Sequence, residues 1–169
     1  MAEDEPETER PDANPVMQAE ALDAVAAHWE DLIDDMEATA AEYRELGWEV
    51  VTVYPAQVFP DMKLPGFDIL IADNDYAAAV EFTEENEVEE YDVYRAETDA
   101  IFFLAVMRDE SNGRALLVPG YYSMEKGSEL RGRIDDSLTI ALNRLKRDVA
   151  VSISLEQPAA FFPEALWGE

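Results

Sequence analysis

Asp73 and Asp75 are the residues whose type and spacing come nearest to a catalytic or metal-binding site. They follow a segment expected to be a strand and open one expected to be a helix, a junction where α/β proteins often place metal-binding carboxylates. The only histidine, His28, could supply a metal ligand or a general base. We favour helix capping by Asp73 or Asn74, with charge complementarity to the helix dipole, as the explanation of this cluster. A divalent-metal-dependent hydrolase using Asp73 and Asp75 is the alternative function.

A second candidate site is a concentration of positive charge between residues 108 and 147. This segment holds eight of the twelve basic residues of the chain against six acidic ones. If these side chains share a face, they would attract an anionic ligand or an acidic protein partner; the alternative is that they form ion pairs at hairpin ends. Neighbouring strand residues face opposite ways, so one of the two adjacent tyrosines in this segment should be exposed. The expected contact residues are Arg108, Arg114, Tyr121, Tyr122, Arg131, Arg133, Arg144 and Arg147.

Several kinds of chemistry lack the residues that they need. The chain has no cysteine, which excludes a disulfide scaffold, a thiolate nucleophile and a cysteine zinc site. The glycines at 120, 127 and 132 fit neither a Walker loop nor a dinucleotide-binding loop. We therefore expect no cofactor, and we favour a noncatalytic binding or regulatory module over an enzyme.

The charge balance indicates an environment rather than an activity. The formal net charge of -27 comes from 39 acidic and 12 basic residues, yet 48% of the residues are hydrophobic, which predicts a folded protein. In molar salt the Debye length falls to about 3 Å, so a carboxylate-rich surface no longer repels itself. We therefore expect a halophilic, cytoplasmic protein.

Partners of several classes are not expected. The first 15 residues carry acids where a signal peptide needs a basic and then an apolar region. The apolar runs fall far short of the ~20 residues that span a bilayer, and an acidic surface repels lipid and nucleic-acid phosphates. We expect no membrane and no nucleic acid as partners, and either a protein partner or a homodimer.

The periodicity predicts one α+β domain at 15–169 behind a disordered acidic tail at 1–14. A long helix should run from Asn14-Pro15 to Gly47, with apolar residues at spacings of three and four. Another helix is expected near 74–85, a short one at 124–135, a loop at 55–66 and an irregular strap at 157–169. Strands are expected at 48–54, 67–72, 90–96, 100–108, 114–118, 137–145 and 148–155, although 138–145 could also form helical turns. We predict a mainly antiparallel sheet of about seven strands, with the long first helix and the second helix packed on one face.

Four short motifs carry a resemblance to known proteins. In order they are Gly47-Trp48, Pro65-Gly66-Phe67-Asp68, residues 91–95, and Phe161-Phe162-Pro163. Their arrangement resembles small acidic haloarchaeal proteins that form uncharacterised families, over about residues 16 to 163. The resemblance implies a high-salt habitat and a single domain, and it transfers no catalytic or binding residue.

Overall fold

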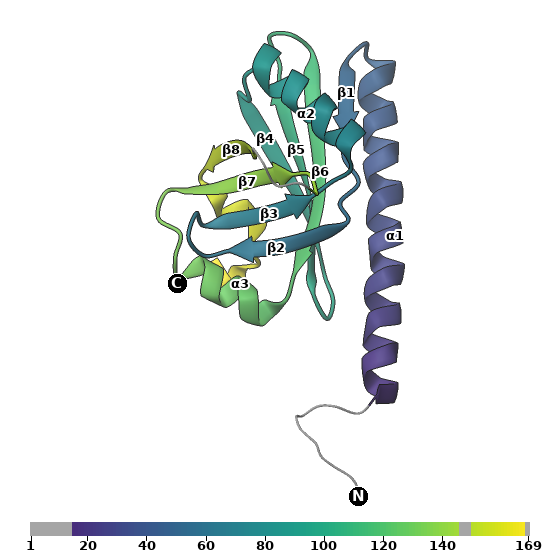
Figure 1. The fold of residues 1–169 in the computed structure, drawn as a ribbon, viewed down its shortest axis with the longest axis vertical. Coiled ribbons are helices and arrows are strands. Elements are labelled where there is room, and N and C mark those ends of the chain that lie inside the picture. Colours follow the sequence, from purple (N-terminus) through teal and green to yellow (C-terminus); the bar gives the residue numbers. More distant parts are fainter. Residues whose placement is uncertain (1–14, 146–149, 168–169) are drawn as a thin grey trace, which may run out of the picture.

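Among the residues that the structure describes, eight strands in two four-stranded sheets form the centre, with helices around them (Figure 1). The computed structural model describes residues 15–145 and 150–167. Its elements are α1 (Pro15–Glu45), β1 (Glu49–Thr52), β2 (Gln57–Asp61), β3 (Gly66–Leu70), α2 (Asp73–Glu85), β4 (Glu90–Glu97), β5 (Ile101–Asp109), β6 (Arg114–Tyr122), α3 (Met124–Arg131), β7 (Ser137–Asn143), β8 (Val151–Glu156), the 3-10 helix η1 (Pro158–Phe161) and α4 (Glu164–Trp167). The expected α+β class is confirmed, and the tail predicted at 1–14 lies outside the described residues.

The strands are divided between two sheets of different order. The first sheet has the order β1-β6-β5-β4, and the second has the order β2-β3-β7-β8. Each contains one parallel pair, β1 with β6 and β3 with β7, while the remaining neighbours are antiparallel. The prediction of one sheet of about seven strands is therefore wrong. Apolar alternation shows that a strand has a buried face, but it does not show which sheet the strand joins.

β2 is the strand that the sequence prediction missed, because Pro55, Pro60 and Pro65 indicated a loop. Pro60 lies within β2, where it is tolerated because β2 is an edge strand of the second sheet. Gly66 begins β3, and a Cβ at this position would lie 1.8 Å from the carbonyl oxygen of Thr139 on β7. The glycine therefore permits the close approach of the parallel neighbour.

An apolar core fills the space between the two sheets, whose strands cross steeply in Figure 1. Aromatic rings from distant segments meet there. The Phe67 centroid lies 4.8 Å from that of Phe103 and 5.5 Å from that of Tyr122, and Phe161 lies 5.3 Å from Phe103. Because Phe161 belongs to η1, the segment after β8 forms part of the core rather than a loose end.

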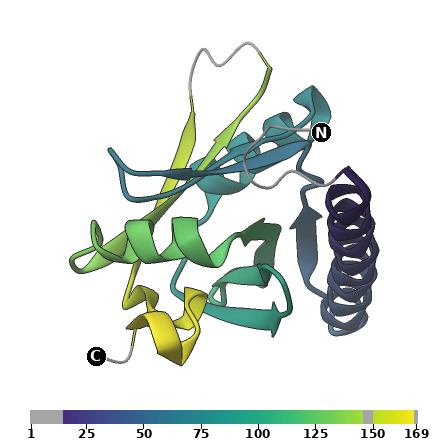
Figure 2. The ribbon, with the colours of Figure 1, turned by 90° about the horizontal axis from the view of Figure 1, so that it is seen from below.

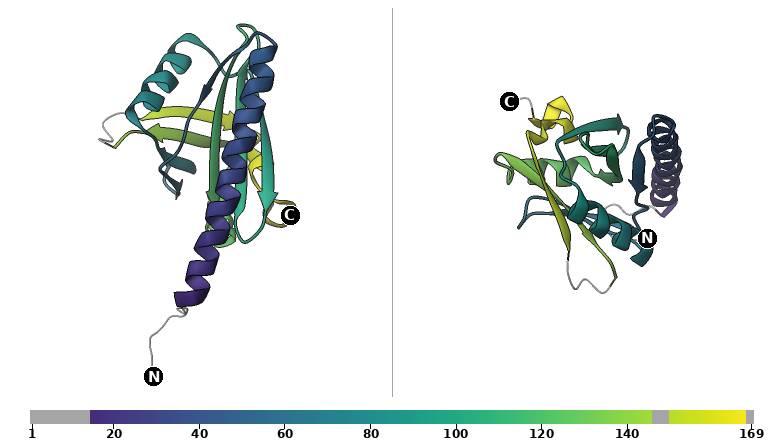
Figure 3. Two further views of the ribbon diagram at one scale, coloured as in Figure 1. Left: turned by 90° about the vertical axis from the view of Figure 1, so that its right-hand side faces the viewer. Right: turned by 90° about the horizontal axis from the view of Figure 1, so that it is seen from above.

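α1 covers the outer face of the first sheet, across which it lies in the left view of Figure 3. Its buried residues Leu32, Met36 and Ala40 recur every four residues and pack on the β5 residues Phe102 and Leu104, among others. The main contacts of α1 with strands are made to β1, β5 and β6. In the same view its amino-terminal turns extend beyond the ends of the strands.

α2 does not share the face that α1 covers. It contacts β1 of the first sheet and β7 and β8 of the second, and its buried residues Ala79 and Phe82 belong to the core between the sheets. The prediction that both helices cover one face is therefore wrong. A helical apolar pattern shows that a helix is buried on one side, but not which surface lies opposite that side.

The remaining elements are the strand β7 and the helices α3 and α4. Residues 137–143 form the strand β7, so the helical alternative for this stretch is wrong. α3 begins after Ser123, whose hydroxyl accepts the backbone N–H of Lys126 at 3.1 Å. α3 packs against the short C-terminal helix α4, and Figure 2 shows both on the side away from α1.

Candidate functional site

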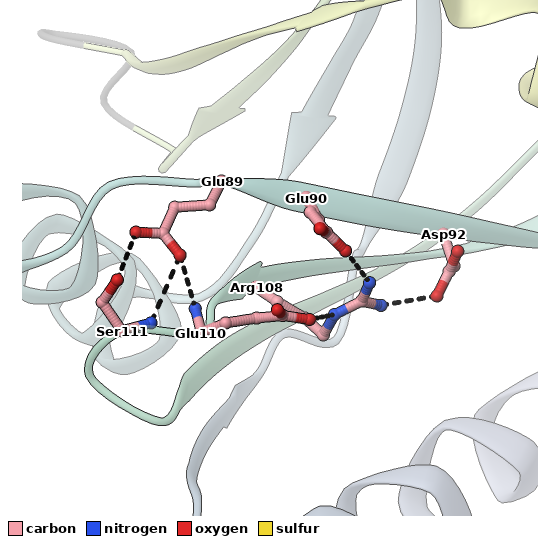
Figure 4. Close-up of polar contacts among 6 residues, drawn as sticks. All are labelled: Glu89, Glu90, Asp92, Arg108, Glu110 and Ser111. Carbon is pink, nitrogen blue, oxygen red and sulfur yellow. Dashed lines mark hydrogen bonds and ion pairs between the residues drawn. The ribbon is translucent and has the colours of Figure 1, made fainter.

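Arg108 on β5 lies at the centre of a carboxylate cluster on the outer face of the first sheet (Figure 4). Its guanidinium donates to Asp92 and Glu90 of β4, and to Glu110 just beyond β5, with nitrogen-to-oxygen distances of 3.1 Å to Glu90 and 3.2 Å to Glu110 and a shorter one to Asp92. Only 10% of the Arg108 side chain is exposed, whereas about half or more of each carboxylate side chain is exposed. The arginine is therefore enclosed, and the surface of the cluster is acidic.

The charge of Arg108 is stabilised by these partners. Burial alone would lower its pKa, but the hydrogen bond and the negative charge of Asp92, together with the bond to Glu90, raise the pKa above its ordinary value. The donors of the guanidinium are directed to carboxylates of the same chain. Its geometry is that of a structural ion-pair cluster.

The other expected contact residues do not converge on one face. Arg114 begins β6 and forms a 2.6 Å ion pair with Glu49, whereas Arg131 and Arg133 lie in or just after α3, which follows the opposite end of β6. A nine-residue strand separates these ends by about 27 Å. The guanidinium of Arg144 lies over the ring of Tyr76 at 5.1 Å. Arg147 lies outside the described residues.

Tyr121 and Tyr122 face opposite sides of β6, as strand alternation requires, but neither is an exposed tyrosine. Tyr122 is 2% exposed in the core between the sheets, and its hydroxyl donates to the carbonyl of Phe161 at 2.6 Å. Tyr121 is half-buried on the other face, where it contacts Trp29 of α1 edge to face with centroids 5.6 Å apart. The expectation of an exposed tyrosine here is not met, because α1 covers one face and the second sheet covers the other.

Asp73 and Asp75 occupy the first turn of α2, but neither caps it. The N-cap position is Ala72, which provides no side-chain hydrogen bond, so the predicted capping by Asp73 or Asn74 is wrong. Asp75 accepts the backbone N–H of Tyr54 at 2.9 Å, which connects the chain after β1 to α2. Among the residues that the structure describes, no group of three or more acidic or histidine side chains is placed to hold a metal ion.

The lone histidine lies apart from these carboxylates. The ring of His28, on α1, lies 5.6 Å from that of Phe102 on β5. This places His28 against the outer face of the first sheet, which α1 covers, whereas Asp73 and Asp75 belong to α2, whose buried residues lie in the core between the sheets. The three residues considered for the hydrolase alternative therefore do not form one site.

The outer side of β4 is the surface that α1 leaves uncovered. We use the name β4 face for the exposed residues Glu90, Asp92, Tyr94 and Ala96, which point to the same side of the sheet as α1. Tyr94 is 56% exposed and is the most exposed of the described aromatic side chains. The β4 face thus has acidic residues at one end and apolar residues at the other.

A groove of about 330 Å³ runs between α1 and the apolar end of the β4 face. Leu104 of β5 lies at its floor, residues 94–96 of β4, which include Arg95, form one wall, and α1 forms the other. The α1 wall consists of Leu32, Asp35, Ala38, Thr39 and Glu42.

A second hollow, of about 500 Å³, lies between β4 and β8, and the carboxylate cluster around Arg108 also lines it. Tyr91 lines it, and its hydroxyl donates to the carbonyls of Glu156 and Gln157 at 2.7 and 2.9 Å. Burial raises the pKa of Tyr91. Arg95 donates to the carbonyl of Ala160 at 2.9 Å, so the C-terminal segment holds this side of β4 in place.

Tyr94 is not among the contact residues expected from the sequence. The strand pattern distinguishes Tyr94 from Tyr91. Tyr94 lies an even number of residues from the charged Glu90 and Asp92 and so faces the same side of the strand, whereas Tyr91 faces the side of Val93. Alternation therefore places Tyr94 outward and Tyr91 inward, which is the arrangement observed.

The chain belongs to the DUF7529 family of unknown function, whose model matches residues 17–163. Comparisons with the curated proteins and with the solved structures each found no match. None of the described helices combines the length and the apolar character that crossing a bilayer requires.

Proposed function

We propose that this protein is a noncatalytic binding module that contacts a protein partner through the β4 face. The observation that carries the proposal is the large exposed area of Tyr94 beside an apolar groove. Exposed aromatic residues next to a hollow are enriched at protein interfaces, because a ring supplies a large contact area at a small loss of conformational entropy.

This proposal moves the contact surface away from the basic residues between 108 and 147. A basic face would need Arg114 and Arg131 on one surface, but Arg114 begins β6, whereas Arg131 ends the helix that follows the other end of this strand. The donors of Arg108 are directed to carboxylates of its own chain, which disfavours an anionic ligand at that residue. The hydrolase alternative gains no support, since Asp75 is bound to the backbone of Tyr54.

The acid excess of the chain supports a high-salt cytoplasm as the setting of this module. In such a medium charge attraction between proteins is screened, so apolar contacts have to supply most of the affinity. An exposed tyrosine beside an apolar floor suits this requirement.

The test compares two substitutions of exposed aromatic residues by aspartate. Tyr94→Asp alters the β4 face, and Phe59→Asp is the matched control, because Phe59 is 42% exposed on β2 of the other sheet. Tagged wild type and both variants, with folding verified by circular dichroism, are used to capture partners from a lysate held at molar KCl. We expect a stoichiometric partner to be retained by wild type and Phe59→Asp and lost by Tyr94→Asp. Equal capture by all three proteins would contradict the proposal.

A further inference from the structure

A helix packed beside α1 on the first sheet would lie over the edge strand β4. α1 contacts β1, β5 and β6, and β6 is the middle one of these three strands, so the axis of α1 lies near β6. β4 lies two strands from β6, which is about 9.6 Å at the usual strand spacing. Packed helices have axes about 8–10 Å apart. A second helix packed beside α1 would therefore lie directly over β4.

The side of α1 that faces the groove has a pattern suited to such a neighbour. Asp35, Ala38, Thr39 and Glu42 line the groove at intervals of three and four residues, which places them on one side of α1. The small residues Ala38 and Thr39 in the middle permit close approach of another backbone. The acidic residues at the two ends lie about 10 Å apart along the axis.

The charge around the groove selects the partner. Asp35 and Glu42 are exposed at its α1 side, whereas the guanidinium of Arg95, which also lines the groove, is directed to Glu97 and to the carbonyl of Ala160. A second copy of this chain is a poor occupant, because α1 itself carries nine acidic residues and one basic residue and would bring like charges together. An occupant with basic residues would be complementary.

We infer that the groove between α1 and β4 receives an amphipathic helix of a partner protein, whose apolar side contacts Tyr94 and Leu104 and whose basic residues, two turns apart, face Asp35 and Glu42. The inference rests on the proposed function and specifies the chemistry of the partner. The bound helix completes the outer layer of the first sheet, so that two helices cover four strands.

The test uses a synthetic peptide as the probe. It has about 15 residues, the length at which an isolated helix becomes stable, with leucine on one side and lysine on the other. A second peptide has glutamate in place of lysine. Binding to the full chain is measured by calorimetric titration at the lowest KCl concentration at which circular dichroism shows the native fold.

Two charge reversals on α1 provide the matched comparison. Glu42→Arg changes the groove wall, whereas Glu30→Arg makes the same change at an exposed α1 residue that does not line the groove. We expect the lysine peptide to bind wild type with one-to-one stoichiometry, and to bind Glu42→Arg about five- to tenfold more weakly, since an attraction is replaced by a repulsion. Glu30→Arg should change the affinity less than twofold, and the glutamate peptide should not bind.

The outcomes separate this inference from the proposed function. Equal weakening by both reversals, or binding of several peptides per chain, would show nonspecific attraction to an acidic protein and overturn the inference. Dimerisation of wild type in light scattering that is abolished by Tyr94→Asp would also overturn it, because a second copy would then occupy the groove. If Tyr94→Asp loses a captured partner while the lysine peptide fails to bind, the β4 face is correct and the helical occupant is wrong. If capture is insensitive to Tyr94→Asp, the proposed function itself fails.

Discussion

The hydroxyl of Tyr122 at the end of β6 donates a 2.6 Å hydrogen bond to the carbonyl of Phe161, which lies 39 residues later in η1. Both side chains are buried in the core between the sheets, and burial raises the pKa of the Tyr122 hydroxyl well above its ordinary value. The bond therefore joins the first sheet to the C-terminal segment in a place without water to replace it.

Tyr122→Phe should lower the free energy of unfolding by about 1–2 kcal/mol, because the carbonyl of Phe161 loses its donor inside the core. Tyr121→Phe, at the neighbouring half-buried position under α1, should change it by less than about 0.5 kcal/mol. Urea unfolding of the two variants beside wild type measures the difference. Equal effects would show that the hydroxyl of Tyr122 contributes no specific stability.

Arg108→Leu should destabilise the protein by about 1–2 kcal/mol, since Glu90, Asp92 and Glu110 would repel one another without the central charge. The estimate is modest because the carboxylates are about half exposed and water screens them. The loss should shrink as KCl is raised, because added salt screens the remaining carboxylates. Arg114→Leu removes a single ion pair with Glu49 and is the control, with an expected loss below about 1 kcal/mol. A loss in Arg108→Leu that does not depend on salt would point to lost packing instead.

Asp109→Ala should make the free energy of unfolding less dependent on pH in the acid range. The hydrogen bond from the Asn112 side chain lowers the pKa of Asp109 below 3.8. Burial has a smaller effect in the opposite direction, and hydrogen bonds from backbone N–H groups, including that of Glu87, lower the pKa further. The ionised form of Asp109 therefore stabilises the fold above pH 3.8, and this contribution is lost as the pH falls through the lower folded-state pKa. The variant should be less stable than wild type at neutral pH and should approach it in acid.

Unfolding free energies measured from neutral pH to about pH 3 test this expectation. Asp99→Ala, in the exposed turn before β5, is the control and should run parallel to wild type. A constant difference between Asp109→Ala and wild type at every pH would contradict the expectation.

Gly66→Ala should prevent native pairing of β3 with β7, because the added Cβ would overlap the backbone of Thr139. We expect a loss above about 3 kcal/mol or failure to fold. Gly113→Ala is the control, because Gly113 has a φ of +67° in a turn with open space around its Cα, and strain there costs about 1 kcal/mol. Thermal melting of both variants distinguishes the steric overlap from ordinary backbone strain.

The individual elements were largely readable from the sequence because their signals are local. In β8, Val151 and Ile153 are buried while Ser152 and Ser154 are exposed, as alternation requires. The division into two sheets was not readable, because it depends on pairings such as β3 with β7 that periodicity does not encode. Pro60 concealed β2, since the tolerance of proline in a strand depends on whether the strand lies at an edge.

The candidate site could be predicted less well, because residues that are close in the sequence need not be close in the folded protein. Arg108 belongs to the basic stretch of the sequence, yet its partners Glu90 and Asp92 lie 18 and 16 residues before it on the paired strand β4. The alternation of residues in β4 predicts the exposure of Tyr94, but the groove beside it depends on how far α1 extends across the sheet.

The two parallel pairs determine how much of the chain the ribosome must synthesise before each sheet can form. Gly66 lies opposite Thr139 and Glu49 opposite Arg114, separations of 73 and 65 residues. At 5–20 residues per second, the partner of β3 is synthesised roughly 4 to 15 s after β3 itself. During this interval the β2–β3 hairpin has no second neighbour, and its apolar residues Phe67 and Ile69 lack their final cover. Such distant pairings are typical of slowly folding domains, and neither sheet can close until at least 65 residues have been added after its first parallel strand begins.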